Sequence, residues 1–226
     1  MPASLPRCTR CLIRLEHMTS HPAAVKIRTR RGYCSGVLVD ASLLPCSQLR
    51  AQLVLTCAHF FRDGLEVGDH YKVSGGFNRR LAAVRTIDGT DIALCLLDNP
   101  APPRDVQGIS TQTPGFREQI VTWGFGGKAR RAQKRRGLFL MPFFRTWSVD
   151  FRTTVSPAGM VFNTVPAVKG DSGGPALVGE DVVGTQALIL NPFGKNLRIA
   201  TLALVGPHRA ALVAAATALL AETKGN

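Results

Sequence analysis

GDSGGP, residues 170–175, is the stretch of this 226-residue chain that decides the fold. It places one serine, Ser172, among glycines and a proline. A serine hydroxyl is a poor nucleophile at neutral pH, so it needs a base, usually histidine, and a carboxylate that holds the imidazole in the right tautomer. His59 and Asp91 precede Ser172 in that order. Taken singly, the three residues also fit a core histidine, a turn aspartate and a tight glycine turn.

Segments around these three residues resemble those of the chymotrypsin- and trypsin-like serine proteases. LTCAH, residues 55–59, resembles the strand end that carries the family's base, with Cys57 where the family usually has alanine. DIAL, residues 91–94, resembles its aspartate segment, and GDSGGP matches its nucleophile segment. The chain order His, Asp, Ser differs from that of subtilisins and α/β-hydrolases.

The resemblance covers most of the chain from His21 onward. HPAAVKI, residues 21–27, and YCSGVLV, residues 33–39, resemble the opening strands of the family's first barrel. The resemblance implies an all-β fold of two antiparallel β-barrels of chymotrypsin type, and a serine endopeptidase that needs no cofactor or metal. In that activity, His59 is the base, Asp91 orients it and Ser172 is acylated. The N–H groups of Gly170 and Ser172 form the oxyanion hole, which stabilises the developing charge.

Asp171 raises the question of activation. In the family this carboxylate is buried, and an uncompensated buried carboxylate is costly. Its cation is either the α-amino group freed when a zymogen is cut or an internal basic residue. The chain has no Ile-Val-Gly-Gly-like start, although a cut after Arg10 or Arg14 would free a new amino group. We therefore expect an internal lysine or arginine partner and no zymogen step.

The resemblance also bears on the residue that precedes the scissile bond. Pro166 stands where trypsin-like enzymes carry the acid that binds basic side chains, so cleavage after Lys or Arg is disfavoured. Ala187, Leu188 and Ile189 align with the wall of the specificity pocket, and Ile189 would narrow it. We expect a small or medium apolar side chain there. Arg198, if it lines the same pocket, would favour an acidic or polar residue instead.

Short apolar runs separated by turn residues predict β-strands through most of the chain. The three prolines of 98–103 predict a linker, because proline cannot donate to a central strand. The expected organisation is an N-terminal arm (1–19), a first barrel (20–104) and a second barrel (105–226) that ends in a C-terminal α-helix. The helix is expected over about 207–222, and its predicted apolar face contains Leu212, Ala215, Ala216 and Leu219.

Composition limits the environment of the protein. No apolar run is long enough to span a bilayer, and the N-terminus lacks the apolar core of a secretory signal. We expect a cytoplasmic protein; the Arg-rich, acid-poor start also fits an organelle transit segment. The six cysteines include one C-x-x-C pair, Cys8 and Cys11, without the partners that a zinc site needs. Reduced, buried thiols are expected, and the oligomeric state stays open.

The net charge of +13 and the basic loop 128–136 suggest a second interpretation. Such a loop could hold an acidic protein or a phosphate backbone, with affinity that falls as salt rises. It is also compatible with an ordinary solvated loop, because it has no interleaved aromatic residues. A non-catalytic protein that binds an anionic partner is therefore the alternative to a protease. The basic residues of this loop are Lys128, Arg130, Arg131, Lys134, Arg135 and Arg136.

An HtrA-like protease is disfavoured, because that group typically has Asn where Asp171 stands and a further domain after the nucleophile.

Overall fold

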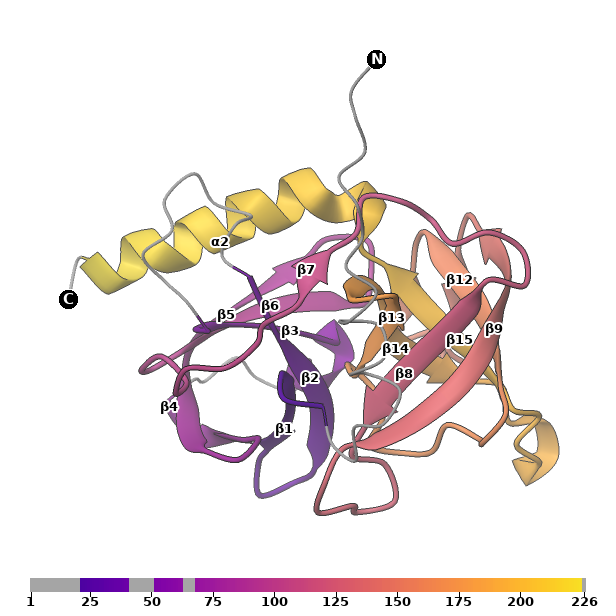
Figure 1. Ribbon diagram of the computed structural model, residues 1–226, viewed down its shortest axis with the longest axis horizontal. Helices are drawn as coiled ribbons and strands as arrows, with labels where there is room; N and C mark the ends of the chain where they lie inside the picture. The colour runs from indigo at the N-terminus through magenta and orange to yellow at the C-terminus, as the bar shows by residue number, and fades with distance from the viewer. Residues whose placement is uncertain (1–20, 41–50, 63–67, 225–226) are drawn as a thin grey trace.

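The structure of the protein, a computed structural model, describes residues 21–40, 51–62 and 68–224 (Figure 1). Two units made of β-strands lie side by side, and one long helix follows them in the sequence. The prediction of two antiparallel β-barrels with a C-terminal α-helix is confirmed. The predicted N-terminal arm, 1–19, lies outside the described residues.

Six antiparallel strands close the first barrel in the order β1-β2-β3-β6-β5-β4, because β1 pairs with both β2 and β4. The apolar runs LVLT and IALCLL form β3 and β6, and all of their residues are buried. Continuous burial along β6 follows from its central place between β3 and β5 and from the helix that packs on it. The strands are β1 (Ala24–Arg28), β2 (Tyr33–Val39), β3 (Leu53–Thr56), β4 (Gly68–Ser74), β5 (Asn78–Ile87) and β6 (Ile92–Leu97).

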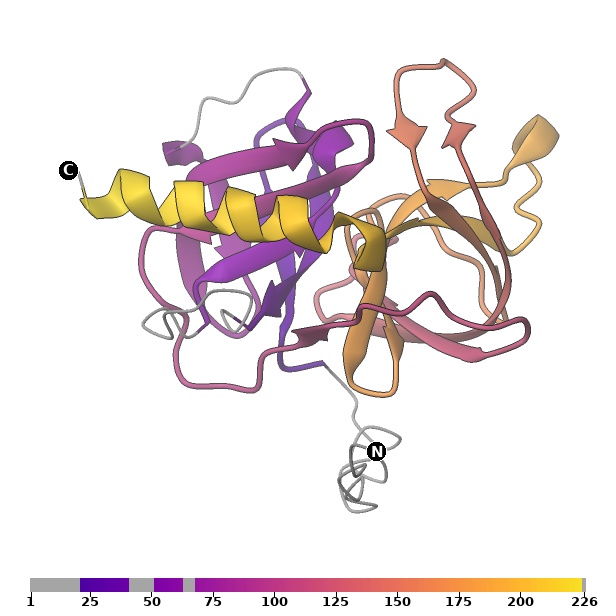
Figure 2. The same cartoon turned by 90° about the horizontal axis from the view of Figure 1, so that it is seen from above.

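The second barrel closes in the order β13-β8-β9-β12-β15-β14, because β13 pairs with both β8 and β14. A short strand, β7, adds to β14 in parallel, and a two-stranded ribbon of β10 and β11 projects from this barrel (Figure 2). The strands are β7 (Gly108–Ile109), β8 (Gln119–Gly124), β9 (Gln133–Phe143), β10 (Thr146–Trp147), β11 (Thr154–Val155), β12 (Ala158–Asn163), β13 (Pro175–Val178), β14 (Asp181–Ile189) and β15 (Ile199–Leu204).

The proline-rich connection after β6 is tied to the first barrel. The Ala101 N–H donates to the Ala51 carbonyl at 2.9 Å. Arg104 donates to the Gly75 carbonyl at 2.6 Å, and its guanidinium lies 4.3 Å from the centre of the Phe77 ring. The predicted linker is therefore an ordered segment that lies along the first barrel and leads to β7 at the edge of the second.

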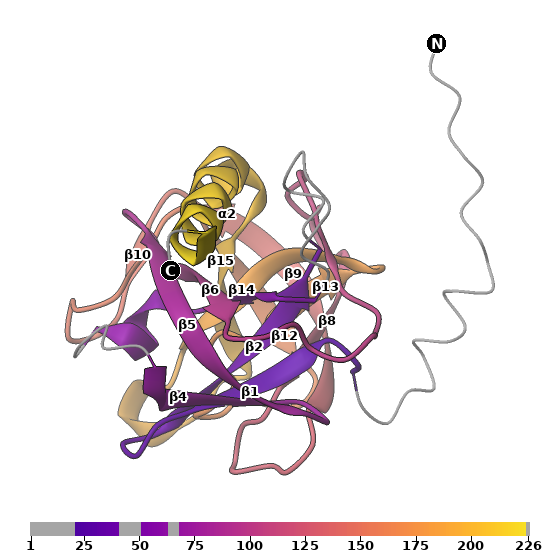
Figure 3. The same cartoon turned by 90° about the vertical axis from the view of Figure 1, so that its left-hand side faces the viewer.

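The helix α2 (Arg209–Lys224) begins after the short turn η4 (Gly206–His208) and crosses from the second barrel to the first, where it packs on β5 and β6 (Figures 2 and 3). Leu212, Ala216 and Leu219 are fully buried, and Ala215 is half-buried. An ion pair between Arg85 and Glu222 joins the exposed side of this contact. The predicted apolar face is confirmed.

Three cysteines, Cys34, Cys57 and Cys95, are buried as free thiols among the described residues. Burial raises the pKa of Cys57 and of Cys95 well above the ordinary thiol value, so both stay protonated at neutral pH. The C-x-x-C pair lies outside the described residues. No helix in the described part of the chain has the length and apolar character needed to cross a membrane.

Replacing Leu219 by alanine should lower the free energy of unfolding by about 2–5 kcal/mol, because the substitution leaves a cavity between α2 and the first barrel. Thr217→Ala, at an exposed position of the same helix, should change it by less than about 0.5 kcal/mol. Urea denaturation of the two variants measures both values. A loss for Leu219→Ala no larger than that of the control would contradict the packing role of this face.

Candidate active site

His59 and Asp91 meet at the end of two paired strands. His59 lies in the turn η2 (Ala58–Phe61) directly after β3, and Asp91 directly precedes β6. Because β3 and β6 pair with Thr56 opposite Ala93, the two side chains come together. Asp91 Oδ2 lies 2.7 Å from His59 Nδ1, and Asp91 Oδ1 accepts the His59 backbone N–H at 2.7 Å. The carboxylate thus fixes both the ring and the backbone of the histidine.

The surroundings of His59 favour its protonated form. Burial of the imidazole opposes its charge, but the interactions with Cys57 and with Asp91 outweigh burial and raise the pKa of His59 above its ordinary value of 6.5. The Cys57 thiol is uncharged at neutral pH, because burial raises its own pKa. We therefore attribute the raised pKa of His59 to the Asp91 carboxylate.

The loop that carries Ser172 comes from the second barrel and lies against the first. Gly173 has φ +78°, and a Cβ there would meet the Thr56 Oγ1 at 2.2 Å and the Ser35 carbonyl oxygen at 2.3 Å. The Ser35 N–H also donates to the Ser172 carbonyl at 2.8 Å. Only glycine permits this close approach, which brings the loop against the strand end that leads to His59.

The three predicted residues do not form a continuous hydrogen-bonded chain in this structure. Among the described residues, no hydrogen bond joins Ser172 Oγ to His59. His59 Nε2 lies instead 3.7 Å from the Sγ of Cys57. In proteins without substrate, hydrogen bonds of this kind are often long and tighten only when substrate binds.

The backbone around Gly170 is held in one orientation. The Gly170 carbonyl accepts a hydrogen bond from Ser35 Oγ at 2.7 Å. Gly170 has φ +101°, and a Cβ there would lie 2.4 Å from the Tyr33 ring, so a larger residue would collide. Within the described chain, the N–H groups of Gly170 and Ser172 donate to no protein acceptor.

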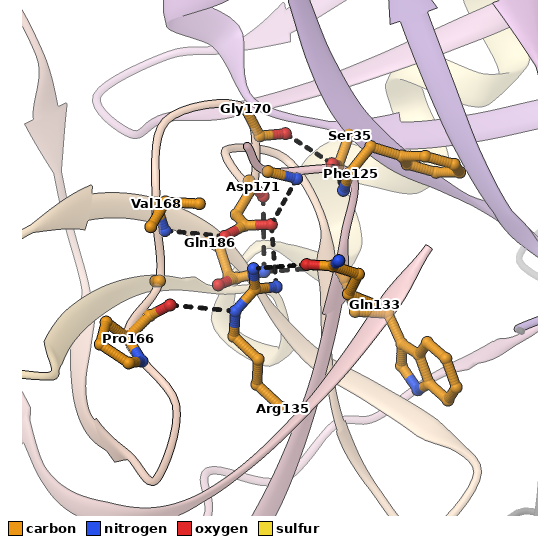
Figure 4. A network of polar contacts seen from close by, with 12 residues as sticks. Ser35, Phe125, Gln133, Arg135, Pro166, Val168, Gly170, Asp171 and Gln186 are labelled. Atoms are coloured by element: carbon orange, nitrogen blue, oxygen red, sulfur yellow. Dashed lines mark hydrogen bonds and ion pairs between the residues drawn. The ribbon is translucent and has the colours of Figure 1, made fainter. Parts of the chain in front are cut away.

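Asp171 is buried and has an internal cation, as expected (Figure 4). Its Oδ1 lies 2.9 Å from Nη1 of Arg135, whose side chain is only 3% exposed. Oδ1 also accepts the Gly126 N–H, and Oδ2 accepts the Val168 N–H, each at 2.8 Å. Arg135 is further held by the Pro166 carbonyl, which accepts from its Nε at 3.1 Å.

Arg135 was predicted to be one of the solvent-facing basic residues of the loop 128–136, and this prediction was wrong. Arg135 points inward from β9, in step with the buried residues Gly137 and Phe139, whereas its neighbour Arg136 is exposed. This alternation with a period of two was the signal in the sequence that could have identified it. Lys128, Arg130 and Arg131 are exposed in the loop before β9, and Arg136 is exposed on β9 itself.

A small pocket opens beside Ser172, with a cavity volume of about 10 Å³. The predicted wall is present, because Ala187, Leu188 and Ile189 all line the pocket. Pro166 does not line it: its carbonyl is turned toward Arg135, and the next residue, Ala167, takes that place. The complete lining is Ala167, Asp171, Ser172, Gln186, Ala187, Leu188, Ile189 and Ala200, and it does not include Arg198.

Sequence reasoning missed Gln186 and Ala200 in this pocket. Strict alternation along β14 would place Gln186 and Ala187 on opposite faces. A shift of the register between Gln186 and Leu188, opposite β15, bends the strand there, and four consecutive residues then line the pocket. The sequence carries no clear signal for this irregularity.

A larger cleft begins at His59 and Asp91 and has a volume of about 560 Å³. It runs between the segment 86–91 of the first barrel and the segment 152–154 of the second. Arg62 closes one side and donates a hydrogen bond to Thr153 Oγ1 across the two barrels.

Comparison by sequence gave no match, either to a protein-family model or to a curated protein. Comparison by structure gives many matches. The Rv3671c protease of M. tuberculosis, in its inactive form, superposes with a TM-score of 0.64 at 16% identity, over 94% of this chain and 99% of that chain. Kallikrein-related peptidase 10 in complex with Zn²⁺ gives 0.65 at 18% identity, over 91% and 97%.

A third similar structure is the scabies mite inactivated protease paralogue S-I1, with a TM-score of 0.65 at 17% identity, over 84% of this chain and 93% of that chain. Proteases and inactivated paralogues therefore share this architecture, and such low identities establish the fold alone. The three superpositions extend over 94%, 91% and 84% of this chain, which includes both barrels. The chain has the fold of the chymotrypsin- and trypsin-like serine proteases.

Proposed function

We propose that the protein is a serine endopeptidase that cleaves peptide bonds through an acyl-enzyme on Ser172. The observation that carries this proposal is the His59–Asp91 pair, with its 2.7 Å contact, at the junction where the Ser172 loop packs against the first barrel. A buried carboxylate bonded to the Nδ1 side of an imidazole leaves Nε2 to act as the base.

The proposed reaction has two stages. Ser172 Oγ attacks the substrate carbonyl carbon while His59 Nε2 takes the hydroxyl proton, and the carbonyl oxygen becomes an oxyanion. The intermediate collapses, the C–N bond breaks and His59 gives its proton to the leaving amine. Water then attacks the ester, with His59 again as base, and Ser172 regains its proton as the acid product leaves.

The backbone of the Ser172 loop supports stabilisation of the oxyanion. The N–H groups of Gly170 and Ser172 have no acceptor within the described protein, and the Ser35 hydroxyl fixes the Gly170 carbonyl. Each such preorganised donor typically contributes about 3–4 kcal/mol to the lowering of a barrier of this kind. We propose these two groups as the oxyanion hole.

The Arg135–Asp171 pair supports activity without a cut. The cation that a buried Asp171 requires is already present within the second barrel. A new α-amino group is then not needed to hold the loop. We propose that the folded enzyme is active without proteolytic cleavage of a zymogen.

The pocket supports a preference for a small residue before the scissile bond. A cavity of about 10 Å³ has about the room that one water molecule needs. Ile189 is part of its lining, and no acid lies in the lining except Asp171, whose carboxylate is held by Arg135. Of the small and medium apolar residues predicted, the pocket favours the small ones.

A second candidate function is non-catalytic binding of an anionic partner through Lys128, Arg130, Arg131 and Arg136. The contact of His59 Nε2 with Cys57 in place of Ser172 favours it. This alternative requires that Ser172→Ala leaves function intact while neutral residues at the four basic positions abolish it. A protease requires the opposite result.

A fluorophosphonate probe should label the folded wild-type protein, and Ser172→Ala should abolish the labelling. Ser110→Ala, which also removes a hydroxyl from a loop, should be labelled like the wild type. In-gel detection and mass spectrometry of the modified peptide measure the result. A folded wild-type protein that stays unlabelled, before and after a cut near Arg10 or Arg14, would contradict the proposed function.

Arg135→Met should remove the labelling and lower the free energy of unfolding by about 3–5 kcal/mol, because the Asp171 carboxylate stays buried without its cation. Arg136→Met is the matched control: it makes the same charge change on the same strand, but at an exposed position. It should change stability by less than about 0.5 kcal/mol and keep the labelling. Equal labelling of the two variants would refute the role of Arg135.

The rate of labelling should rise with pH through the pKa of His59, because only the neutral imidazole accepts the Ser172 proton. Since Asp91 raises that pKa, the midpoint should lie above 6.5. Asp91→Asn should lower the titration midpoint of His59, followed by NMR, and slow the reaction about 10⁴-fold. A wild-type midpoint at or below 6.5 would show that the Asp91 carboxylate does not stabilise the imidazolium.

A further inference from the structure

Gln186 is a buried polar residue in the pocket beside Ser172. The residue is part of the lining and is only 3% exposed. Two backbone hydrogen bonds fix it against the Ser172 loop: the Gln186 N–H donates to the Gly174 carbonyl at 2.9 Å, and its carbonyl accepts the Gly173 N–H at 2.7 Å. The backbone of Gln186 is thus held in place by the same loop that carries the proposed nucleophile.

The neighbours of the Gln186 amide determine which way it is turned. Its Nε2 lies 3.3 Å from the Trp123 carbonyl oxygen and 3.4 Å from the Asp171 carbonyl oxygen. Two acceptors require the NH₂ group on that side, so the oxygen Oε1 occupies the other side. Oε1 is buried and has no hydrogen-bond partner within the described protein. Buried acceptors are normally satisfied, so this one calls for an explanation.

The rest of the lining offers a ligand little other polarity. Ala187, Leu188, Ile189 and Ala200 are apolar, and the Asp171 carboxylate is held by Arg135 and two backbone N–H groups. Apart from Ser172 itself, Gln186 Oε1 is the side-chain acceptor without a partner in this lining. The cavity of about 10 Å³ admits one group the size of a water molecule or a methyl.

We propose that Gln186 is the residue that determines specificity, and that its Oε1 accepts a hydrogen bond from the hydroxyl of a substrate serine immediately before the scissile bond. The inference rests on the proposed function and names its substrate class: peptides cleaved after serine. Alanine and glycine fit the pocket but leave the acceptor unpaired. Threonine, valine and larger residues exceed its size.

Two matched peptide substrates test this on the unaltered protein. One has serine before the scissile bond and the other has 2-aminobutyrate, in which a methyl group replaces the hydroxyl at equal size. We expect kcat/KM to be about three- to tenfold higher for serine, the range that one neutral hydrogen bond supplies. Leucine and arginine at that position should be cleaved at least about tenfold more slowly than serine. Equal rates for serine and 2-aminobutyrate, or faster cleavage after a large residue, would overturn the proposal.

The variant Gln186→Met removes the amide and keeps an unbranched side chain of similar length. The ratio of serine to 2-aminobutyrate cleavage should fall to about one or below, because the acceptor is gone. Gln52→Met is the matched control: Gln52 is a buried glutamine of the first barrel that donates to the Leu97 carbonyl, far from the pocket in the fold. Its ratio should equal that of the wild type. An unchanged ratio in Gln186→Met would overturn the role of the amide, and if this variant does not fold, the two wild-type substrates still decide.

Fluorophosphonate labelling, measured in the same samples, separates the two levels of the argument. Labelling of Ser172 without a preference for serine contradicts the role of Gln186 and leaves the endopeptidase intact. Absence of labelling and of cleavage in the folded wild-type protein overturns both. Labelling together with the serine preference supports both.

Discussion

The ion pair between Asp171 and Arg135 is the constraint on which the site depends. A carboxylate this deeply buried is tolerated only with a cation and several hydrogen bonds, and Asp171 has one cation and two backbone N–H donors. With its side chain anchored, the backbone of Asp171 is fixed as well. Its carbonyl then accepts the Gly174 N–H and lies near the Gln186 amide. Ser172, the proposed oxyanion donors and the wall of the small pocket all adjoin this one buried residue.

The site itself belongs to neither barrel. The first supplies the histidine and its carboxylate from adjacent strands, and the second supplies the serine from a loop. Small residues at the junction let the two backbones approach within hydrogen-bond distance, as between Ser35 and Ser172. A shift of either barrel relative to the other would change the distance from His59 to Ser172. The segment that connects the barrels is hydrogen-bonded to both, through Gln107 to Leu38 and through Ser110 to Val182.

Local sequence pattern predicted the barrel strands and the apolar face of α2, and the resemblance to the chymotrypsin-like proteases predicted that His59 meets Asp91. It predicted that Asp171 has an internal cation but not which one, because the alternating burial along β9 that distinguishes Arg135 from Arg136 was not recognised within a run of basic residues. The pocket was predicted only in part. Its wall depends on an irregular register at Gln186, and its far side on the direction of the Pro166 carbonyl, and both are set by tertiary contacts.

Helix α2 follows the second barrel in the sequence but packs on the first, which is synthesised before it. Leu212, Ala216 and Leu219 belong to the same apolar core as β6. During synthesis, the outer side of β5 and β6 therefore stays uncovered until the whole second barrel and the helix have emerged. A ribosome that stalls within the second barrel would leave a nascent chain with an exposed apolar strip, the kind of surface that chaperones bind.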